Sequence, residues 1–527
     1  MKLLNKTVAV QGAYTLHELA DEDRYTLSVI PTENCTLSQI SATFSFHFQS
    51  NDALFLNGYQ SWSFSPERGI HEYDKSLRHC PKFLDLSFGF SCYGDGHFYP
   101  PTYKRGLLHG YSYAYIRRGE KFFLFASLKE SSGFTRIIFD TRKNKVCFEK
   151  DCAERVLDQS YVALDVVFLE GTENEVFDRW FALLELKALP AERAVGYTSW
   201  YNCYQDISAK RIESDLEGLK ALPVLPDIFQ IDDGFEPFVG DWLTTDKTKF
   251  PNGTKPIADR IIREGYRAGI WLAPFVCEKN SALYSEHPDY LLRNADGTPV
   301  YCGSNWSGAY ALDFYKDAVR DYIRQTIEKY KAEGFSLFKL DFLYAVCMLP
   351  RPNKTRGEIM DEAMSFLRTV CGDAQIIGCG VPLAAAFGKV EYCRIGPDVT
   401  FSFDDKAYMH LLHAERPSTR HTMLNTVFRR QLSSRAFLND PDVFILRDEN
   451  TSLTATQKQA LGTVNGLFGG LLFASDEFEK YDSPKKELYL AFTHLKNAQN
   501  VRAHKEKNRL ILQYSIDGEE KTFSFNC

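Results

Sequence analysis

From about residue 191 onward, short apolar runs alternate with segments whose apolar residues recur at helical spacing. Buried parallel strands are nearly continuous apolar runs, so this alternation predicts a parallel sheet covered by helices. Helices are expected at Asp317–Ala332 and Gly357–Cys371, among others. Eight runs are predicted strands: Val195–Trp200, Asp227–Ile231, Arg267–Ala273, Ser336–Phe342, Gln375–Gly378, Tyr392–Ile395, Ala436–Asn439 and Gly470–Ala474. Eight strands over about 300 residues indicate an α/β fold, a (β/α)8 TIM barrel enlarged by insertions. The Glu278–Gly308 insertion after the third strand is expected to form part of a site wall.

The first 190 residues follow a different pattern. Runs of β-branched and aromatic residues mix with polar ones, and clusters of Gly and Asp separate them, which is typical of an antiparallel β-sandwich. The clearest strand candidates are Phe122–Leu128, Thr135–Phe139, Val146–Glu149 and Tyr161–Leu169. Two segments break the pattern and are predicted to be loops, Asn57–Ser63 and the Gly- and Pro-rich Phe88–Gly106.

These changes of pattern predict three parts. Residues 1–190 form an N-terminal β-sandwich, and a helical run at Phe177–Leu186 followed by Pro190 marks the linker. Residues 191–498 form the barrel. Residues 499–527 form a short C-terminal β segment with strands at Arg509–Tyr514 and Lys521–Phe525. That segment is too short to bury a core of its own, so it is expected to pack against the barrel.

Composition excludes several classes of function. The chain has 527 residues and a formal net charge of −7 without basic blocks, which argues against a nucleic-acid partner. The N-terminus becomes polar too soon for a signal peptide, and no apolar run reaches membrane-spanning length. Thirteen cysteines without a Cys-x-x-Cys pair predict a reduced, cytoplasmic chain with neither disulfides nor a zinc cluster. His410 and His413 with Glu415 do not form a His-Glu-x-x-His pattern, so no metal site is expected. The oligomeric state is not predicted.

One apolar run contains two charged residues. Lys339 and Asp341 lie within Phe335–Tyr344 and are two residues apart, so on a strand they point to the same face. Buried charges are costly unless they are paired or used. A cation beside a carboxylate holds it ionised, as a carboxylate nucleophile requires. A purely structural ion pair is the alternative.

Catalytic residues of such barrels lie at the C-terminal ends of the strands. The residues at these ends are Trp200, Asp232, Asp233, Trp271, Lys339, Asp341, Cys379, Arg394, Asp398 and Asn439–Asp442. Carboxylates, two cations and two tryptophans suit a polyhydroxylated neutral ligand better than a phosphorylated one, and no Gly-rich phosphate cradle is evident. Each residue also has a structural explanation: Asp232–Asp233 could be a turn, Asn439–Asp442 is expected to be one, and Cys379 could be a small packed residue. Arg394 could pair with Asp398 structurally, and Trp62 in the first loop could be packing or a sugar platform.

Together these motifs resemble glycoside hydrolase family 36, the α-galactosidases, and most of all its shorter bacterial members. The resemblance covers almost the full length, through the segments Gly-Tyr-Gln-Ser-Trp-Ser (58–63), Ile-Asp-Asp-Gly-Phe (231–235), Gly-Ile-Trp-Leu-Ala-Pro-Phe (269–275), Phe-Lys-Leu-Asp-Phe (338–342), Arg-Ile-Gly-Pro-Asp-Val (394–399) and Asn-Asp-Pro-Asp (439–442). It implies an N-terminal β-sandwich, a catalytic barrel and a C-terminal β domain. It also implies a retaining exo-α-galactosidase that needs no cofactor and acts on oligosaccharides such as melibiose and raffinose.

The resemblance also implies a role for each rim residue. Asp341 would be the nucleophile and Asp398 the general acid/base. The pair Asp232 and Asp233 would hold the 4- and 6-hydroxyls of galactose. The other hydroxyls and the walls would be lined by Lys339, Cys379, Arg394, Trp62, Trp200 and Trp271. Two features depart from the family: Phe235 stands where the usual motif has Trp, and the C-terminal region is short.

Three alternatives remain open at this point. An α-N-acetylgalactosaminidase would keep these groups and widen the pocket around the 2-substituent. A galactosyl transferase of the raffinose-synthase type would use the same intermediate with a sugar acceptor. A non-catalytic sugar-binding protein would not need both carboxylates.

Overall fold

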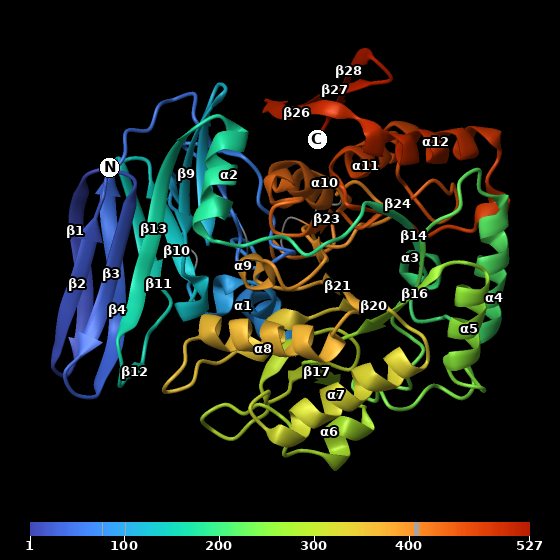
Figure 1. The fold of residues 1–527 in the computed structure, drawn as a ribbon, viewed down its shortest axis with the longest axis horizontal. Coiled ribbons are helices and arrows are strands. Elements are labelled where there is room, and N and C mark those ends of the chain that lie inside the picture. The colour runs from blue at the N-terminus through green and yellow to red at the C-terminus, as the bar shows by residue number, and fades with distance from the viewer. Residues whose placement is uncertain (76, 101, 405–408, 410–411) are drawn as a thin grey trace.

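The computed structural model describes residues 1–75, 77–100, 102–404, 409 and 412–527. In Figure 1 the N-terminal strands form a layered body on the left, the helix-covered parallel sheet lies on the right, and the last three strands lie along the top.

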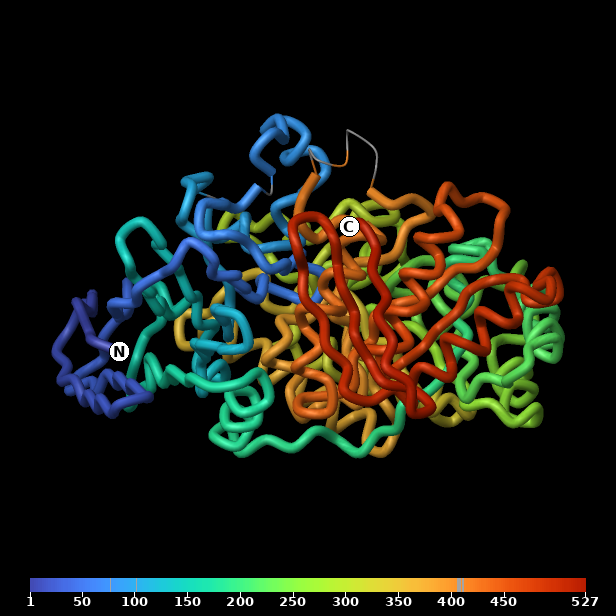
Figure 2. Tube along the Cα trace, turned by 90° about the horizontal axis from the view of Figure 1, so that it is seen from above, coloured from blue at the N-terminus to red at the C-terminus, as the bar shows by residue number. Residues whose placement is uncertain are grey.

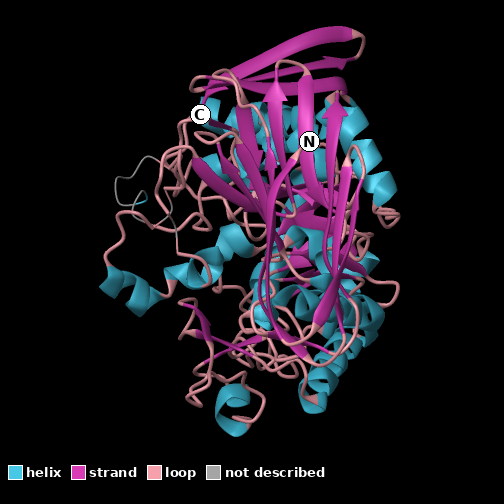
Figure 3. Ribbon diagram, turned by 90° about the vertical axis from the view of Figure 1, so that its left-hand side faces the viewer, coloured by secondary structure: helices cyan, strands magenta, loops and turns pink. Residues whose placement is uncertain are grey.

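The N-terminal part is built from two antiparallel sheets packed face to face (Figures 1 and 3). One sheet has the order β1-β4-β11-β10-β7, with β12 also on β4, and the other has the order β2-β3-β13-β9-β8-β5-β6. The bounds are β1 Leu3–Gln11, β2 Tyr14–Ala20, β3 Arg24–Pro31, β4 Cys35–Ser45, β5 Ala53–Leu56, β6 Arg68–Gly69, β7 Leu107–Tyr111, β8 Tyr113–Arg118, β9 Lys121–Ser127, β10 Thr135–Asp140, β11 Lys145–Lys150, β12 Arg155–Leu157 and β13 Tyr161–Gly171. Buried and half-buried residues alternate strictly along β10 and β11, because one face of each strand lies on the core. The predicted sandwich and its four strand candidates are confirmed.

The parallel sheet contains all eight predicted barrel strands. They are β14 Ala194–Thr198, β15 Ile228–Ile231, β16 Arg267–Leu272, β20 Leu337–Leu340, β21 Gln375–Gly378, β22 Tyr392–Arg394, β23 Leu438–Asp440 and β25 Leu471–Ala474, and the two-residue β24 (Val443–Phe444) pairs with β25. Consecutive strands pair in parallel from β14 to β23, and β25 pairs with β14. The Gly470 N–H donates to the Asn439 carbonyl (2.7 Å), so the start of β25 also meets β23 and the strands close into a barrel. Gly196 is required on β14, since a Cβ there would lie 1.8 Å from the Phe473 ring of β25.

Helices cover the barrel between its strands (Figure 1). The main ones are α4 Ala209–Gly218, α5 Lys255–Arg263, α7 Asp317–Ala332, α8 Arg356–Cys371, α10 Thr419–Phe428, α11 Ala455–Phe468 and α12 Ser483–His494. Both barrel helices named from the sequence are confirmed, and α8 begins one residue earlier than expected; the helical run predicted before Pro190 is α2 Glu173–Leu183. The start of α8 is fixed by a capping box, in which Thr355 and Glu358 satisfy each other's backbone N–H groups. The insertion after β16 forms a small antiparallel sheet of β17 Val276–Glu278, β18 Tyr301–Gly303 and β19 Ala309–Ala311, with the short helix α6 Ala282–Glu286.

The loop after β5 connects the sandwich to the barrel. The Ser61 N–H donates to the Val381 carbonyl (2.8 Å), and the fully buried Arg429 donates to the Ser61 carbonyl (2.6 Å). These bonds fix the predicted ordered loop, which contains Trp62, at the C-terminal rim of the barrel. The second predicted loop, Phe88–Gly106, follows the short helix α1 (Lys82–Phe88) and contains two 3-10 turns.

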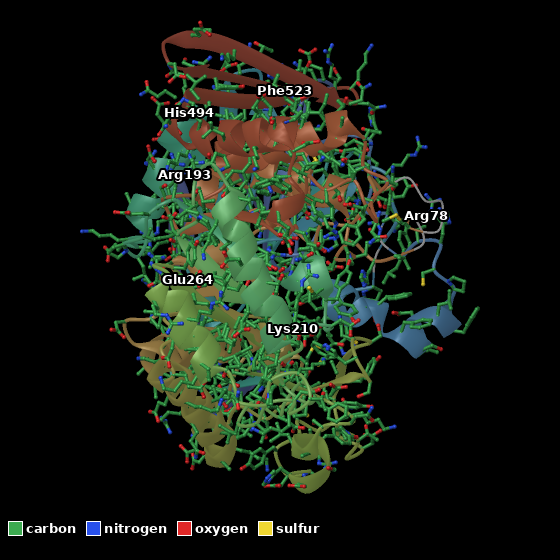
Figure 4. The ribbon with its side chains drawn as sticks, turned by 90° about the vertical axis from the view of Figure 1, so that its right-hand side faces the viewer. Arg78, Arg193, Lys210, Glu264, His494 and Phe523 are labelled. Carbon is green, nitrogen blue, oxygen red and sulfur yellow. The ribbon has the colours of Figure 1, made fainter. Side chains whose placement is uncertain are left out.

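The C-terminal segment is a three-stranded meander of β26 Gln499–Glu506, β27 Arg509–Ile516 and β28 Glu519–Asn526. Two of its strands were predicted and β26 was not. Leu510, Leu512 and Phe525 are buried in the same core as the barrel, and His494 at the end of α12 pairs with Asp517 (2.9 Å). Figure 4 shows His494 and Phe523 at the same end of the molecule, and Figure 2 shows the meander lying across the barrel. The expectation that this segment packs on the barrel is confirmed.

Candidate active site

Asp341 stands directly after β20, at the C-terminal rim. Its Oδ2 accepts a hydrogen bond from Trp271 Nε1 (3.1 Å), and its Oδ1 accepts one from the Phe342 N–H (2.8 Å). Phe342 has a φ of 54°, a left-handed conformation that is uncommon for a bulky residue. Such strain is typical of sites whose surroundings hold the backbone in place. The buried Asp341 carboxylate is therefore fixed in position by two donors.

The charges of Lys339 and Asp341 interact, as expected, but Lys339 makes its direct ion pair with another carboxylate. Lys339 Nζ makes its ion pair with Asp232 Oδ2 (2.8 Å), at the end of β15. Barrel geometry explains this pair. Inward side chains from alternate strands share one layer, and β15 and β20 are alternate strands because β16 lies between them. Side chains at the ends of β15 and β20 can therefore meet. Although burial opposes it, the charge of Asp232 and then that of Asp341 raise the pKa of Lys339. Lys339 thus lies between two carboxylates and binds one of them.

The Asp232–Asp233 pair is held by donors from several elements. Gln230 Nε2 donates to Asp232 (2.9 Å), and despite burial the Lys339 charge lowers the pKa of Asp232. Gln205 Nε2 donates to both oxygens of Asp233 (3.1 Å each), and Trp306 Nε1 donates to Asp233 Oδ2 (2.8 Å). Trp306 belongs to the insertion expected to form a wall. These contacts show that the pair is more than a surface turn.

Glu236 is a buried carboxyl that the sequence did not single out. Its Oε2 accepts from the Gly234 N–H (3.3 Å), whereas its Oε1 has no hydrogen-bond partner among the described residues. Burial, and then the charge of Asp233, raises the pKa of Glu236 well above its usual range. Burial, with the charge of Asp232, also raises the pKa of Asp233 against the opposing effect of its hydrogen bonds. Gly234 makes the turn possible with a φ of 116°, and a Cβ there would meet the Gln205 backbone at 2.7 Å.

Arg394 on β22 organises the other side of the rim. It donates to Asp398 Oδ1 (2.8 Å) and to Asp440 Oδ2 (3.1 Å), and its Nη2 lies 2.9 Å from Asp442 Oδ1. The expectation that Asn439–Asp442 is only a turn is therefore wrong. Its two carboxylates hold the arginine that holds Asp398. A repeat of acidic residues directly after the seventh strand was the signal that could have identified them.

Asp398 and Asp442 differ in their access to solvent. The Asp398 side chain is 37% exposed and that of Asp442 is 1% exposed. Desolvation, with the charge of Asp341, raises the pKa of Asp398 against the opposing effect of Arg394. Burial raises the pKa of Asp442 to about 7, and this residue also accepts from the Tyr201 hydroxyl and the Val399 N–H. Asp398 is the carboxyl that can exchange a proton with a ligand.

The remaining predicted residues line the same rim. Trp62 Nε1 donates to Cys379 Sγ (3.3 Å), and its ring packs edge-on against Phe342 (5.1 Å between centroids). Burial raises the pKa of the Cys379 thiol well above its usual range, so the thiol stays protonated. Trp200 begins the short helix α3 (Trp200–Cys203) after β14, and its ring packs against Tyr204 (5.0 Å).

Of the two histidines considered as metal ligands, His410 lies outside the described residues and only His413 lies within them. His413 packs against Tyr93 (4.8 Å), and burial lowers its pKa to about 3. In the described part of the chain, no three His, Cys, Asp or Glu residues are grouped so as to hold a metal ion, and no helix has the length and apolar character to cross a membrane.

Comparison with known sequences identifies related proteins. The melibiase family model matches residues 182–368. Probable α-galactosidase C of Aspergillus flavus is 24% identical over 375 residues, which cover 66% of this chain and 48% of that protein. α-Galactosidase Mel36A of Lactobacillus acidophilus is 31% identical over 144 residues, covering 26% of this chain and 19% of that protein. The chain thus spans about half the length of the first of these relatives and less of the second.

Solved structures match over nearly the whole chain. The α-galactosidase TtGalA of Thermus thermophilus, in complex with p-nitrophenyl α-D-galactopyranoside, aligns with a TM-score of 0.73 at 24% identity, over 97% of this chain and 98% of that one. The family 36 α-galactosidase AgaA of Geobacillus stearothermophilus aligns with a TM-score of 0.60 at 12% identity, over 97% and 77%. The resemblance to glycoside hydrolase family 36 is confirmed. These structures show that the family 36 fold, a β-sandwich followed by a TIM barrel, extends over the chain.

The motif Ile-Asp-Asp-Gly-Phe (231–235) differs from the usual family 36 motif at a residue of the core. Phe235 replaces the usual Trp and is fully buried, with its ring 6.4 Å from Trp242 and 5.7 Å from Tyr330. With Phe at this position, the two preceding aspartates still have their hydrogen-bond donors.

Proposed function

We propose that the protein is a retaining, exo-acting α-galactosidase that hydrolyses terminal α-linked galactose from oligosaccharides such as melibiose and raffinose. The observation that carries the proposal is a pair of carboxyls in contrasting environments on one barrel rim. Asp341 is buried and fixed by two donors, whereas Asp398 is partly exposed and its pKa is raised. The complexes of TtGalA with p-nitrophenyl α-D-galactopyranoside and with stachyose support this substrate class.

The reaction would proceed by double displacement. Asp341 attacks the anomeric carbon while Asp398 donates its proton to the departing glycosidic oxygen. The Asp398 carboxylate then removes a proton from water, which attacks the anomeric carbon and releases both galactose and Asp341. The anomeric configuration is retained because two inversions cancel. This mechanism requires the two carboxyls to be about 5–5.5 Å apart.

The rest of the rim would bind the sugar. Charged acceptors at Asp232 and Asp233 suit the 4- and 6-hydroxyls, since hydrogen bonds to carboxylates are strong. The other hydroxyls would meet Lys339, Cys379 and Arg394, with Trp62, Trp200 and Trp271 as walls. The reaction needs no cofactor, because both proton transfer and nucleophilic attack come from side chains. The thirteen cysteines are unpaired, which agrees with action in the reducing cytoplasm.

The two catalytic roles can be separated by chemical rescue. Asp398→Ala should lose activity on natural sugars but still form the glycosyl-enzyme from substrates with good leaving groups, which need little protonation. Azide should then attack that intermediate from the side opposite Asp341 and give an α-galactosyl azide. In Asp341→Gly, azide enters the space left by the nucleophile and should give a β-galactosyl azide.

Product stereochemistry read by NMR decides the assignment. Interchanged products would mean that the roles of Asp341 and Asp398 are reversed. Assaying aryl α-galactoside beside aryl α-N-acetylgalactosaminide separates the galactosidase from an N-acetylgalactosaminidase. Added sucrose separates hydrolysis from galactosyl transfer, because a transferase would make a trisaccharide. A protein that binds galactose without turnover of either aryl substrate would be a non-catalytic binder.

A further inference from the structure

A cavity of about 360 Å³ opens at the same end of the barrel, beyond the residues assigned above. Its walls come from the segments that follow β14, β24 and β25, with Phe401 contributed by the segment that follows β22. The residues that matter here are Tyr201, Tyr204, Phe401, Arg447 and Lys485. None of them belongs to the proposed galactose site.

The cavity lies on the side of the general acid. The Tyr201 hydroxyl on its wall donates to Asp442, which shares Arg394 with Asp398. Asp398 and Asp442 also act electrostatically on the Tyr204 hydroxyl, whose pKa is raised by burial and by these two charges. A general acid protonates the oxygen of the leaving group, so the leaving group must lie next to it. The cavity therefore lies where the departing part of a substrate would extend.

Tyr204 presents an aromatic ring to this cavity. It is 44% exposed, although its ring packs against Trp200 (5.0 Å) and Phe401 (6.0 Å). Its backbone has φ 48° and ψ −136°, a conformation that a bulky residue adopts only under strain. Backbone strain of this kind clusters at binding and catalytic sites, where surrounding contacts maintain it. Flat aromatic rings with a polar tip suit the apolar faces of sugars.

The cations on the wall have carboxylate partners, and Arg447 lies 3.7 Å from Asp476. Lys485 pairs with Asp448 (2.8 Å), and Lys480 pairs with Glu477 (2.8 Å). Arg447 lies over the Phe401 ring (4.4 Å) and donates to the Tyr201 carbonyl (2.8 Å). Paired charges offer donors and acceptors without attracting an ion of either sign. This lining suits a neutral, polyhydroxylated ligand.

We propose that this cavity is the binding site for the sugar residue that leaves galactose, with Tyr204 as its aromatic platform. The same site would hold an acceptor sugar when galactose is transferred rather than hydrolysed. This inference rests on the proposed galactosidase function, because it assigns the leaving-group side of that reaction.

The test compares a substrate that fills the cavity with one that does not. Tyr204→Gly removes the ring and suits the positive φ, so it should not strain the fold. Melibiose and raffinose place a sugar in the cavity, whereas fluoride departing from α-galactosyl fluoride occupies none of it. We expect the ratio of kcat/KM for melibiose to that for α-galactosyl fluoride to fall about tenfold in Tyr204→Gly, which is the effect of losing one aromatic contact. Tyr204→Phe keeps the ring and should keep this ratio within about twofold.

The outcomes distinguish a failure of the cavity assignment from a failure of the proposed galactosidase function. A wild-type enzyme that does not hydrolyse α-galactosyl fluoride would contradict the galactosidase proposal itself. An unchanged ratio in Tyr204→Gly, whether both substrates slow equally or neither does, would overturn the assignment of the cavity. Thermal unfolding of both variants checks that they fold, and free glucose as a competitive inhibitor gives a second readout. Its inhibition constant should rise in Tyr204→Gly and not in Tyr204→Phe.

Discussion

Replacing Glu236 by Gln tests whether the folded protein keeps Glu236 protonated. Glu236 is buried, and burial followed by the charge of Asp233 raises its pKa well above the usual range. The amide of Gln has nearly the shape of a protonated carboxyl and needs no proton uptake, and its oxygen can still accept from the Gly234 N–H. Glu236→Gln therefore keeps this contact and removes its dependence on pH.

The size of the effect follows from proton linkage. The unfolded chain loses the Glu236 proton near its ordinary pKa of 4.5, whereas the folded chain keeps it to higher pH. The folded state therefore binds more protons in this window, and wild-type stability falls as pH rises until the folded pKa is reached. Each pH unit inside the window costs the wild type about 1.4 kcal/mol relative to Glu236→Gln. In a chain of this length that corresponds to roughly 1–2 °C in Tm.

Differential scanning calorimetry of both proteins at pH 5, 6 and 7 measures this difference. The difference in Tm, Glu236→Gln minus wild type, should increase at each step in pH. Glu236→Ala is the control, because it leaves the buried Gly234 N–H without its acceptor and should be less stable than Glu236→Gln throughout, by about 1–3 kcal/mol. A Tm difference between Glu236→Gln and wild type that stays constant from pH 5 to 7 would mean that Glu236 is ionised in the folded protein.

Three further predictions concern the rim. Asp232→Asn should lower both kcat/KM and thermal stability, because losing one partner of the buried Lys339 pair costs about 3–5 kcal/mol, whereas Asp233→Asn should lower kcat/KM with a smaller change in Tm. An unchanged Tm in Asp232→Asn would show that the Lys339 charge does not depend on this carboxylate. Arg394→Lys should reduce kcat/KM for melibiose at least about 100-fold, because an ammonium cannot reproduce a guanidinium that bonds three carboxylates. Near-wild-type kinetics would refute that role. Turnover of aryl α-galactosides should continue in EDTA, and activity that vanishes there and returns with a divalent ion would contradict a mechanism without metal.

The fold was largely predictable because its strands are buried. Runs such as Leu337–Leu340 have apolar residues on both faces of the sheet, and this marks them in the sequence as well as in the structure. In the C-terminal segment, the strand that was not predicted, β26 Gln499–Glu506, buries only Ala503 and contains mostly polar residues. Its pairing with β27 is decided by backbone hydrogen bonds, which have no sequence signature.

Site residues were predictable by position and their partners were not. The rule that active residues follow barrel strands placed Asp341 and Asp398 on the rim. The periodicity of one strand cannot show that Lys339 reaches across to Asp232, because that contact depends on the layering of alternate strands. Nor can it show that Glu236 turns inward, since the turn depends on the positive φ of Gly234.

The rim carries more carboxylates than cations, and this imbalance contributes to the raised pKa of Asp398, the proposed general acid. Five carboxylates (Asp232, Asp341, Asp398, Asp440 and Asp442) face two cations, Lys339 and Arg394, which leaves an excess of three negative charges among the residues joined by these contacts. In a desolvated cleft, such an excess is relieved by binding protons. The raised pKa values of Asp398 and Asp442 reflect this repulsion together with burial. Of these two, only Asp398 is substantially exposed, at 37% against 1%, so its proton is the one that can reach a glycosidic oxygen. Removing the Asp442 charge should therefore weaken the ion pairing that keeps Arg394 in position. It should also lower the pKa of Asp398.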